Sequence, residues 1–286
     1  MNTGILYALL AMAAYGLSDV FAKAQIHRFS RSLILFMRGV LISMVLGSIV
    51  LLYPAPVPIS PFLLFTVALG IAGFVPVYFY LSAVKKGNLS IVAPIAKSAV
   101  IITVLLSLLF LNERLNLIQA VLICVIILGV LLLSMNIRSL FTLRWKETHA
   151  GVLPALVAAL LWGVAFFVWK FPVQAYGPLF CAFVTETGVA VGALPFLKKE
   201  DIPALRKMNW KLFGIVFACA MTTLLGTIGY MKAISMAPLS LVMPIVTATP
   251  VVSTLIAVTY FKERLSAVQW LGGILVVSGI ALLFVM

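Results

Sequence analysis

The chain has 286 residues, of which 64% are hydrophobic and only 9% are charged. A water-soluble protein of this length cannot bury so much apolar surface in one core, so lipid must be the solvent for most of the chain. The formal charge of +13 would suggest nucleic-acid binding in a soluble protein, but here the basic residues lie mostly in short loops between apolar runs, which is typical of membrane topology.

Taken in chain order, continuous apolar runs of about 20 residues predict ten transmembrane α-helices and leave little room for any other domain. Membrane strands would be shorter and would alternate apolar with polar residues, unlike these runs. We therefore predict an all-α integral membrane protein. The predicted helices cover residues 3–23, 31–53, 61–84, 89–111, 116–136, 150–171, 177–197, 211–234, 239–261 and 266–286.

The two halves of the chain repeat one pattern. At an offset of 147 residues, Gly4 in the first predicted helix matches Gly151 in the sixth. At an offset of 150, residues 89–95 of the fourth helix match residues 239–245 of the ninth, including the proline. Unrelated apolar helices would not keep polar and proline positions in register, so we infer a duplication.

The duplication divides the chain into a first five-helix repeat, residues 1–140, and a second, residues 150–286. Because each repeat has an odd number of helices, the second enters the membrane from the opposite side, and the repeats are inverted. Inverted repeats are a common plan of secondary transporters, in which an exchange of conformation between the halves gives alternating access.

Positive charge predicts the orientation of the helices. Fifteen of the 20 Lys and Arg residues lie in the loops after the odd-numbered helices. These loops should face the cytoplasm, which places both chain ends on the other side of the membrane. We expect a multi-pass protein of the cell membrane, specifically the inner membrane of a bacterium.

The fourth helix of each half begins with Leu-Ser-x-Val-x-Pro and is followed by Glu-Arg-Leu, at residues 113–115 and 263–265. In these motifs the chain resembles the EamA-type branch of the drug/metabolite transporter superfamily, over nearly its whole length. The resemblance implies ten helices around a central cavity, lined mainly by helices 1, 3, 4, 6, 8 and 9, and transport of amino acids, nucleotide sugars, vitamins or other metabolites, commonly outward.

The chain departs from the symmetric pattern in its fourth helix. Lys97 stands where the second half has Thr247, and Val100 stands where it has Pro250. Lys97 lies about 12 Å into its helix at ~1.5 Å per residue. A charge at that depth costs at least ~2.5 kcal/mol, so Lys97 is a candidate to line the cavity, as a counter-charge for an acidic substrate group or as a coupling site. The alternative is an internal salt bridge.

Arg38 and Glu186 occupy matching places in the two halves, at an offset of 148 residues. Their opposite charges predict a pair across the repeat interface. Such a pair could fix the packing of the helices. Glu186 could instead face the cavity and serve as a proton-coupling site, and the sequence leaves both interpretations open.

Asp19 lies four residues before Lys23 on the first predicted helix. This spacing favours an ion pair along the helix near the membrane surface. Alternatively, Asp19 lies at the mouth of the cavity and meets a cationic group of the substrate.

Four aromatic residues stand at equivalent places of the two halves. Tyr15 matches Trp162 at an offset of 147, and Tyr80 matches Tyr230 at an offset of 150. On helices that line the cavity in the family, they would offer a flat amphipathic wall to an aromatic or zwitterionic substrate. Ordinary helix packing is the alternative for each.

Prolines in the fourth helices are candidate gating residues. Pro94, Pro244 and Pro250 interrupt helical hydrogen bonding and permit kinks or local unwinding beside the cavity.

Other chemistry has little support in the sequence. Three cysteines fall inside apolar runs without paired spacing, and the two histidines lie in basic loops. We therefore predict no disulfide, metal site or cofactor, and no catalytic activity. These residues are Cys124, Cys181, Cys219, His27 and His149.

These observations favour a secondary active transporter that exports amino-acid-like or related small metabolites by alternating access, driven by protons or by exchange. A carrier of anionic metabolites, carboxylated or phosphorylated and with uptake as a further direction, is the alternative drawn from Arg38 and Lys97. A membrane scaffold or receptor without transport and an intramembrane lipid enzyme are the remaining classes. The expected partners are a small-molecule substrate and lipid, without nucleic acid, for a monomer or a homodimer.

Overall fold

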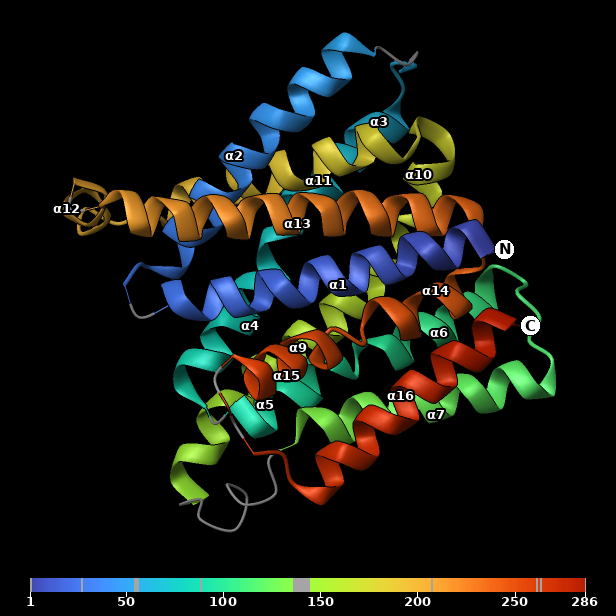
Figure 1. Cartoon of the computed structure of the whole chain (residues 1–286). Coiled ribbons are helices and arrows are strands. Elements are labelled where there is room, and N and C mark those ends of the chain that lie inside the picture. Colours follow the sequence, from blue (N-terminus) through green and yellow to red (C-terminus); the bar gives the residue numbers. More distant parts are fainter. Residues whose placement is uncertain are drawn as a thin grey trace.

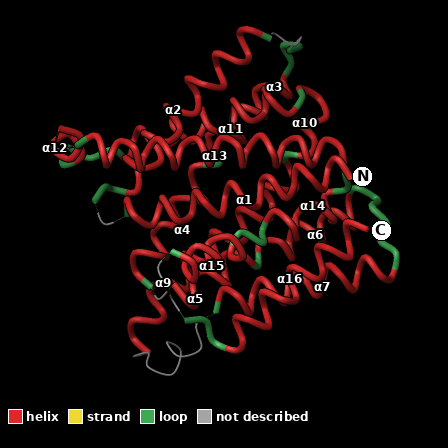
Figure 2. The backbone as a smooth tube through the Cα atoms, viewed as in Figure 1, coloured by secondary structure: helices red, strands yellow, loops and turns green. Residues whose placement is uncertain are grey.

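The computed structural model describes residues 2–26, 28–53, 57–87, 89–135, 145–206, 208–260, 262 and 264–285. Within these ranges the chain is helical and contains no strand (Figure 2). The described residues form ten spans of 18 to 27 residues that are long and apolar enough to cross a membrane. The prediction of an all-α protein with ten transmembrane helices is confirmed, and the spans differ from the predicted ranges by at most five residues.

The helices follow one another along the chain with short connections (Figure 1). They are α1 (Asn2–Gln25), α2 (Arg31–Leu52), α3 (Pro61–Ala72), α4 (Phe74–Lys86), α5 (Leu89–Lys97), α6 (Ala99–Phe110), α7 (Leu117–Ser134), α9 (Trp145–Val168), α10 (Lys170–Tyr176), α11 (Pro178–Ala193), a 3₁₀ turn (Leu194–Phe196), α12 (Asp201–Arg206), α13 (Trp210–Met236), α14 (Leu239–Val246), α15 (Pro250–Thr259) and α16 (Ala267–Val285).

Four of these spans consist of two helices each: α3 with α4, α5 with α6, α9 with α10, and α14 with α15. The breaks in the fourth and ninth spans agree with their prolines. Pro94 lies inside α5, which ends at Lys97, while Pro244 lies inside α14 and Pro250 begins α15. A proline removes a helical hydrogen bond and clashes with the preceding turn, so both helices end shortly after it.

Packing between the halves follows a two-fold pattern. The first and eighth spans pack together as α1 and α13, and the third and sixth as α4 and α9. The second span packs on the seventh as α2 and α11, and the fifth on the tenth as α7 and α16. If the two halves are exchanged, the pair of the first and eighth spans becomes the pair of the sixth and third. The pair of the second and seventh spans and that of the fifth and tenth each stay the same, as expected for inverted repeats. Both chain ends lie on one side of the bundle, which we call the terminal side (Figure 1).

Two glycines demonstrate the symmetry at atomic detail. A Cβ atom on Gly16 of α1 would lie 2.6 Å from Cβ of Val252, and one on Gly163 of α9 would lie 2.6 Å from Cβ of Ile102. Gly16 and Gly163 are equivalent residues, and so are Val252 and Ile102. In both halves only glycine allows the first helix to approach the fourth helix of the other half so closely.

The largest buried cluster joins side chains from both halves and extends over α1, α2, α6, α7, α10, α11, α13, α14 and α16. Many large apolar side chains remain exposed along α7 and α16, where lipid chains would solvate them.

Candidate substrate site

Three polar side chains meet where helices of the two halves are broken. The Nζ atom of Lys97 lies 3.5 Å from Oδ2 of Asp19 and donates a hydrogen bond of 2.7 Å to Oγ1 of Thr249. The Thr249 hydroxyl in turn donates to Oδ2 of Asp19 at 3.3 Å. The side chains of Asp19 and Lys97 keep 41% and 21% of their surface exposed. We call these three residues the Asp19–Lys97 site.

The helix breaks bring these side chains together. Lys97 is the last residue of α5, and Thr249 ends the turn that separates α14 from Pro250. Broken helices in a membrane are tolerated where they are buried in protein or line a polar space. Gly16 brings α1 close to this turn, since a Cβ atom there would lie 2.9 Å from the Thr249 carbonyl oxygen. The site therefore lies between the two repeats.

The partner of Asp19 differs from the one that helical spacing favoured. Among the described residues Asp19 forms an ion pair with Lys97 and none with Lys23. Spacing along one helix could not reveal this contact, because Lys97 belongs to another span. Thr249 had no signal of its own in the sequence beyond its place between two prolines.

A second polar group is buried between α1, α2, α11 and α13. Nη2 of Arg38 lies 3.5 Å from Oε2 of Glu186, so the expected pair across the repeats is formed. The Thr227 hydroxyl donates to Oε1 of Glu186 at 2.7 Å, and the Tyr15 hydroxyl donates to Thr227 at 3.1 Å. We call these four residues the Glu186 network. Nε of Arg38 is buried and finds no acceptor in the described part of the chain, so the pair is incompletely satisfied.

The two polar groups are linked by α1. Tyr15 belongs to the Glu186 network and Asp19 to the Asp19–Lys97 site, and they lie four residues apart on one face of the helix. A shift of α1 would therefore act on both groups together.

The four predicted aromatic residues divide into two sets. The rings of Tyr80 and Trp162 lie 5.2 Å apart at 51°, and Tyr80 is within electrostatic range of the Asp19 carboxylate. Tyr15 is part of the Glu186 network. Tyr230 is buried to 2% exposure, and its hydroxyl donates to the carbonyl oxygen of Phe166 at 2.7 Å. The structure thus places the Tyr230 hydroxyl in a contact between the sixth and eighth spans.

The Glu-Arg-Leu motif of the first half has a local role. The Glu113 carboxylate accepts hydrogen bonds from the backbone N–H groups of Leu239 at 2.7 Å and Ser240 at 2.8 Å. These groups begin α14, where the helix leaves N–H groups without partners and where negative charge is favourable. The recurrence of the motif was the signal that this glutamate matters. Its counterpart Glu263 lies outside the described residues.

No group of three or more His, Cys, Asp and Glu side chains that could hold a metal ion occurs among the described residues. The cysteines are free, with Cys124 exposed and Cys181 and Cys219 buried. The side chains of His27 and His149 lie outside the described part of the structure.

Known proteins share this architecture. The model of the EamA-like transporter family matches residues 2–135 and again residues 149–285. An uncharacterised protein of Methanocaldococcus jannaschii is 33% identical over 141 residues, which cover 48% of this chain and 99% of that protein. A crystal structure of another protein is 21% identical and superimposes with a TM-score of 0.77, over 97% of this chain and 95% of that one. With its ten spanning helices and a family match to both halves, the chain is a multi-pass membrane protein and belongs to the EamA-like transporter family.

Proposed function

We propose that this protein is a secondary active transporter that exports amino-acid-like zwitterions by alternating access. The observation that carries the proposal is the pair of Asp19 and Lys97, two opposite charges that are 3.5 Å apart and partly exposed at the helix breaks. A zwitterion presents an ammonium group and a carboxylate at similar separation. It could replace the internal pair by placing its ammonium on Asp19 and its carboxylate on Lys97.

Charge balance favours a zwitterion over an anion. Within the spans, Lys97 is paired with Asp19 and Arg38 with Glu186, so both groups are neutral as a whole. An added net charge in a medium of low dielectric constant is costly unless it is compensated. A substrate of zero net charge keeps the balance, whereas a phosphorylated or dicarboxylated metabolite would leave an acidic side chain uncompensated.

The surroundings of the site agree with an amphipathic substrate. Tyr80, which interacts electrostatically with Asp19, forms an aromatic pair with Trp162, and an aromatic face binds both apolar and cationic groups. The Thr249 hydroxyl can donate to a substrate carboxylate when Asp19 turns away from it.

Glu186 is the group that we propose for proton coupling. Its carboxylate is buried and is neutralised by Arg38, whose Nε lacks an acceptor within the described residues. Protonation of Glu186 would weaken this pair and the hydrogen bond from Thr227. Through Tyr15 the change reaches α1, which carries Asp19.

The experiment is ligand-dependent thermal stabilisation of the purified protein. The panel contains neutral amino acids, their N-acetyl and amide derivatives, dicarboxylates and sugar phosphates. We expect stabilisation by zwitterions only, because the derivatives each lack one charge. Loss of one charge-assisted hydrogen bond in Lys97→Met or Asp19→Asn removes about 1.5–3 kcal/mol of binding free energy, which is roughly tenfold or more in affinity.

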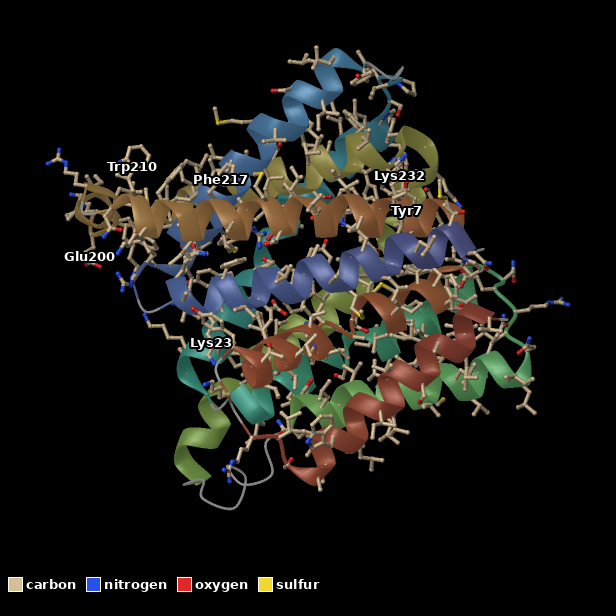
Figure 3. The ribbon with its side chains drawn as sticks, viewed as in Figure 1. Tyr7, Lys23, Glu200, Trp210, Phe217 and Lys232 are labelled. Atoms are coloured by element: carbon tan, nitrogen blue, oxygen red, sulfur yellow. The ribbon has the colours of Figure 1, made fainter. Side chains whose placement is uncertain are left out.

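Lys232→Met is the matched control, because Lys232 lies on α13 in the half of the span that ends on the terminal side (Figure 3), outside the Asp19–Lys97 site. It should leave the affinity unchanged. Stabilisation by dianions that survives in Asp19→Asn would favour the anion carrier instead. Stabilisation by a zwitterion that survives both site variants would reject the site.

A further inference from the structure

Two hydrogen-bonded contacts hold the sixth span against the eighth on the terminal side. Lys170 donates from Nζ to the carbonyl oxygens of Ile234 at 2.5 Å and Ala237 at 3.2 Å. One helical turn away, Tyr230 donates to the carbonyl oxygen of Phe166 at 2.7 Å. We call these contacts the α13 clasp. The lysine supplies donors to the carbonyl groups at the end of α13, which lack helical partners and favour a positive charge.

The duplicated sequence contains the same set of residues between the first and third spans. At the offset of 147, Lys170 corresponds to Lys23 and Phe166 to Asp19; at the offset of 150, Tyr230 corresponds to Tyr80, Ile234 to Val84 and Ala237 to Gly87.

These counterparts do not form a clasp. Among the described residues, neither the Lys23 side chain nor the Tyr80 hydroxyl has a hydrogen bond, and Lys23 is exposed. Figure 3 shows Lys23 at the end of α1 that is far from the chain termini, opposite Tyr7 and Lys232. The lysine and tyrosine donors are therefore hydrogen-bonded on the terminal side, whereas their counterparts on the opposite side have no hydrogen bond among the described residues.

The neighbouring contacts are equal on both sides, so the difference is local. A Cβ atom on Gly4 would lie 2.6 Å from Cβ of Ala237, at the end of α13. A Cβ atom on Gly151, the counterpart of Gly4, would lie 2.6 Å from the Cα atom of Gly87, at the end of α4. Each of these helix ends is thus packed against the other half. Only the end of α13 is also held by the first helix of its own half.

We propose that Lys23 and Tyr80 form the equivalent clasp on α4 in the opposite state of the transport cycle, while Lys170 and Tyr230 release α13. In that state Lys23 donates to the carbonyl oxygens of Val84 and Gly87, and the Tyr80 hydroxyl donates to the carbonyl oxygen of Asp19. The inference rests on the proposed alternating access, since an exchange of conformation between inverted repeats turns one clasp into the other.

The proposed clasp on α4 includes two residues near the substrate. Asp19 contributes its backbone carbonyl to the clasp and its carboxylate to the Asp19–Lys97 site. Tyr80 contributes its hydroxyl to the clasp and its ring to the contact with Trp162. Closure of the clasp and occupation of the site therefore involve the same two residues, Asp19 and Tyr80.

The test measures distances between spin labels in the purified protein reconstituted in lipid, without any substrate. One pair of labels, at Ala24 and Lys86, reports on the ends of α1 and α4; the other, at Ala175 and Met236, reports on the ends of α10 and α13. All four positions are exposed and lie outside the two clasps. The native cysteines are replaced beforehand, namely Cys124, Cys181 and Cys219.

In Lys170→Met we expect the Ala175–Met236 distribution to gain a longer component and the Ala24–Lys86 distribution to gain a shorter one. Tyr230→Phe keeps the ring and removes only the hydroxyl, so it should shift both distributions in the same direction by less. Combining Lys170→Met with Lys23→Met should reduce the shorter component, because the proposed clasp on α4 then also lacks its lysine contact.

Lys170→Arg keeps a cationic donor and should restore the unsubstituted distributions, and Lys232→Met should not change them. The proposal is overturned if Lys170→Met and Tyr230→Phe leave both distributions unchanged, or if the terminal side opens without approach of Ala24 and Lys86. Since no ligand is present, this result is independent of whether the site binds a zwitterion.

Discussion

Two equivalent pairs of a lysine and a tyrosine, one in each half, differ in their hydrogen bonding. Between the sixth and eighth spans, Lys170 and Tyr230 donate to backbone carbonyl groups. Between the first and third spans, Lys23 and Tyr80 have no hydrogen bond among the described residues, although their positions are equivalent. Residue type and position in the repeat therefore do not fix a role. The Tyr230 hydroxyl is engaged in a contact between helices, whereas the Tyr80 hydroxyl has no hydrogen bond in the described structure.

The first half supplies two of the three residues of the Asp19–Lys97 site, and the second half supplies Thr249. In the first half, part of Asp19 is exposed and the Tyr80 ring lies beside Trp162. On the terminal side the corresponding residue to Asp19 is Phe166, whose ring packs on Tyr230 at 5.3 Å. The two halves share the same helix arrangement, but the charged residues of the site, Asp19 and Lys97, stand where the second half has the uncharged residues Phe166 and Thr247.

The largest effect should come from Glu186, whose network includes Tyr15 on the helix that also carries Asp19 and Lys23. Glu186→Gln keeps the shape of the side chain but cannot release a proton. We expect proton-driven efflux from proteoliposomes to fall to the level without a gradient, while ligand-induced stabilisation persists. Glu200→Gln is the control, because Glu200 is exposed at the end of the molecule far from the chain termini (Figure 3). Full gradient-driven efflux in Glu186→Gln would remove the coupling role.

A smaller effect should test the symmetric part of the comparison. Gly16→Ala and Gly163→Ala each place a Cβ atom 2.6 Å from a neighbouring Cβ atom. Overpacking of this kind costs about 1–3 kcal/mol of stability. We expect the two losses to be similar in denaturant unfolding of the protein in detergent. A loss at only one glycine would show that the close contacts of the two halves are not energetically equivalent.

The smallest effect should test the asymmetric part. Tyr230→Phe leaves the Phe166 carbonyl without its donor and should cost about 1 kcal/mol of stability. Tyr80→Phe removes a hydroxyl that has no hydrogen-bond partner in the described structure, so it should have no measurable cost in the same unfolding assay. Equal losses for both tyrosines would mean that the two contacts are in the same state in solution.

Much of the fold follows from local features of the sequence. The length of the apolar runs predicts the ten spans, and Pro94, Pro244 and Pro250 predict the broken fourth and ninth spans. The equivalence of Arg38 and Glu186 in the repeat predicts their contact, because inverted halves bring matching positions to the interface.

The candidate site was less accessible to sequence reasoning. Helical spacing favoured Lys23 as the partner of Asp19, whereas the partner in the structure is Lys97, which belongs to another span. Thr249 lies in the turn between α14 and α15, which packs closely on Gly16 of α1. Tyr80 and Tyr230 are equivalent in the repeat but differ in their contacts, and a symmetric sequence pattern contains no information about that difference.

The pairing of α1 with α13 and of α4 with α9 has a consequence for biosynthesis. Helices enter the bilayer in chain order, so the first five are inserted before most of their packing partners have been made. Asp19 can find Lys97 within this nascent half, but Arg38 has no carboxylate until Glu186 emerges from the ribosome. A guanidinium in lipid without its counter-ion is unfavourable. During synthesis, water, lipid headgroups or the insertion machinery must therefore solvate the Arg38 guanidinium until the seventh span is inserted.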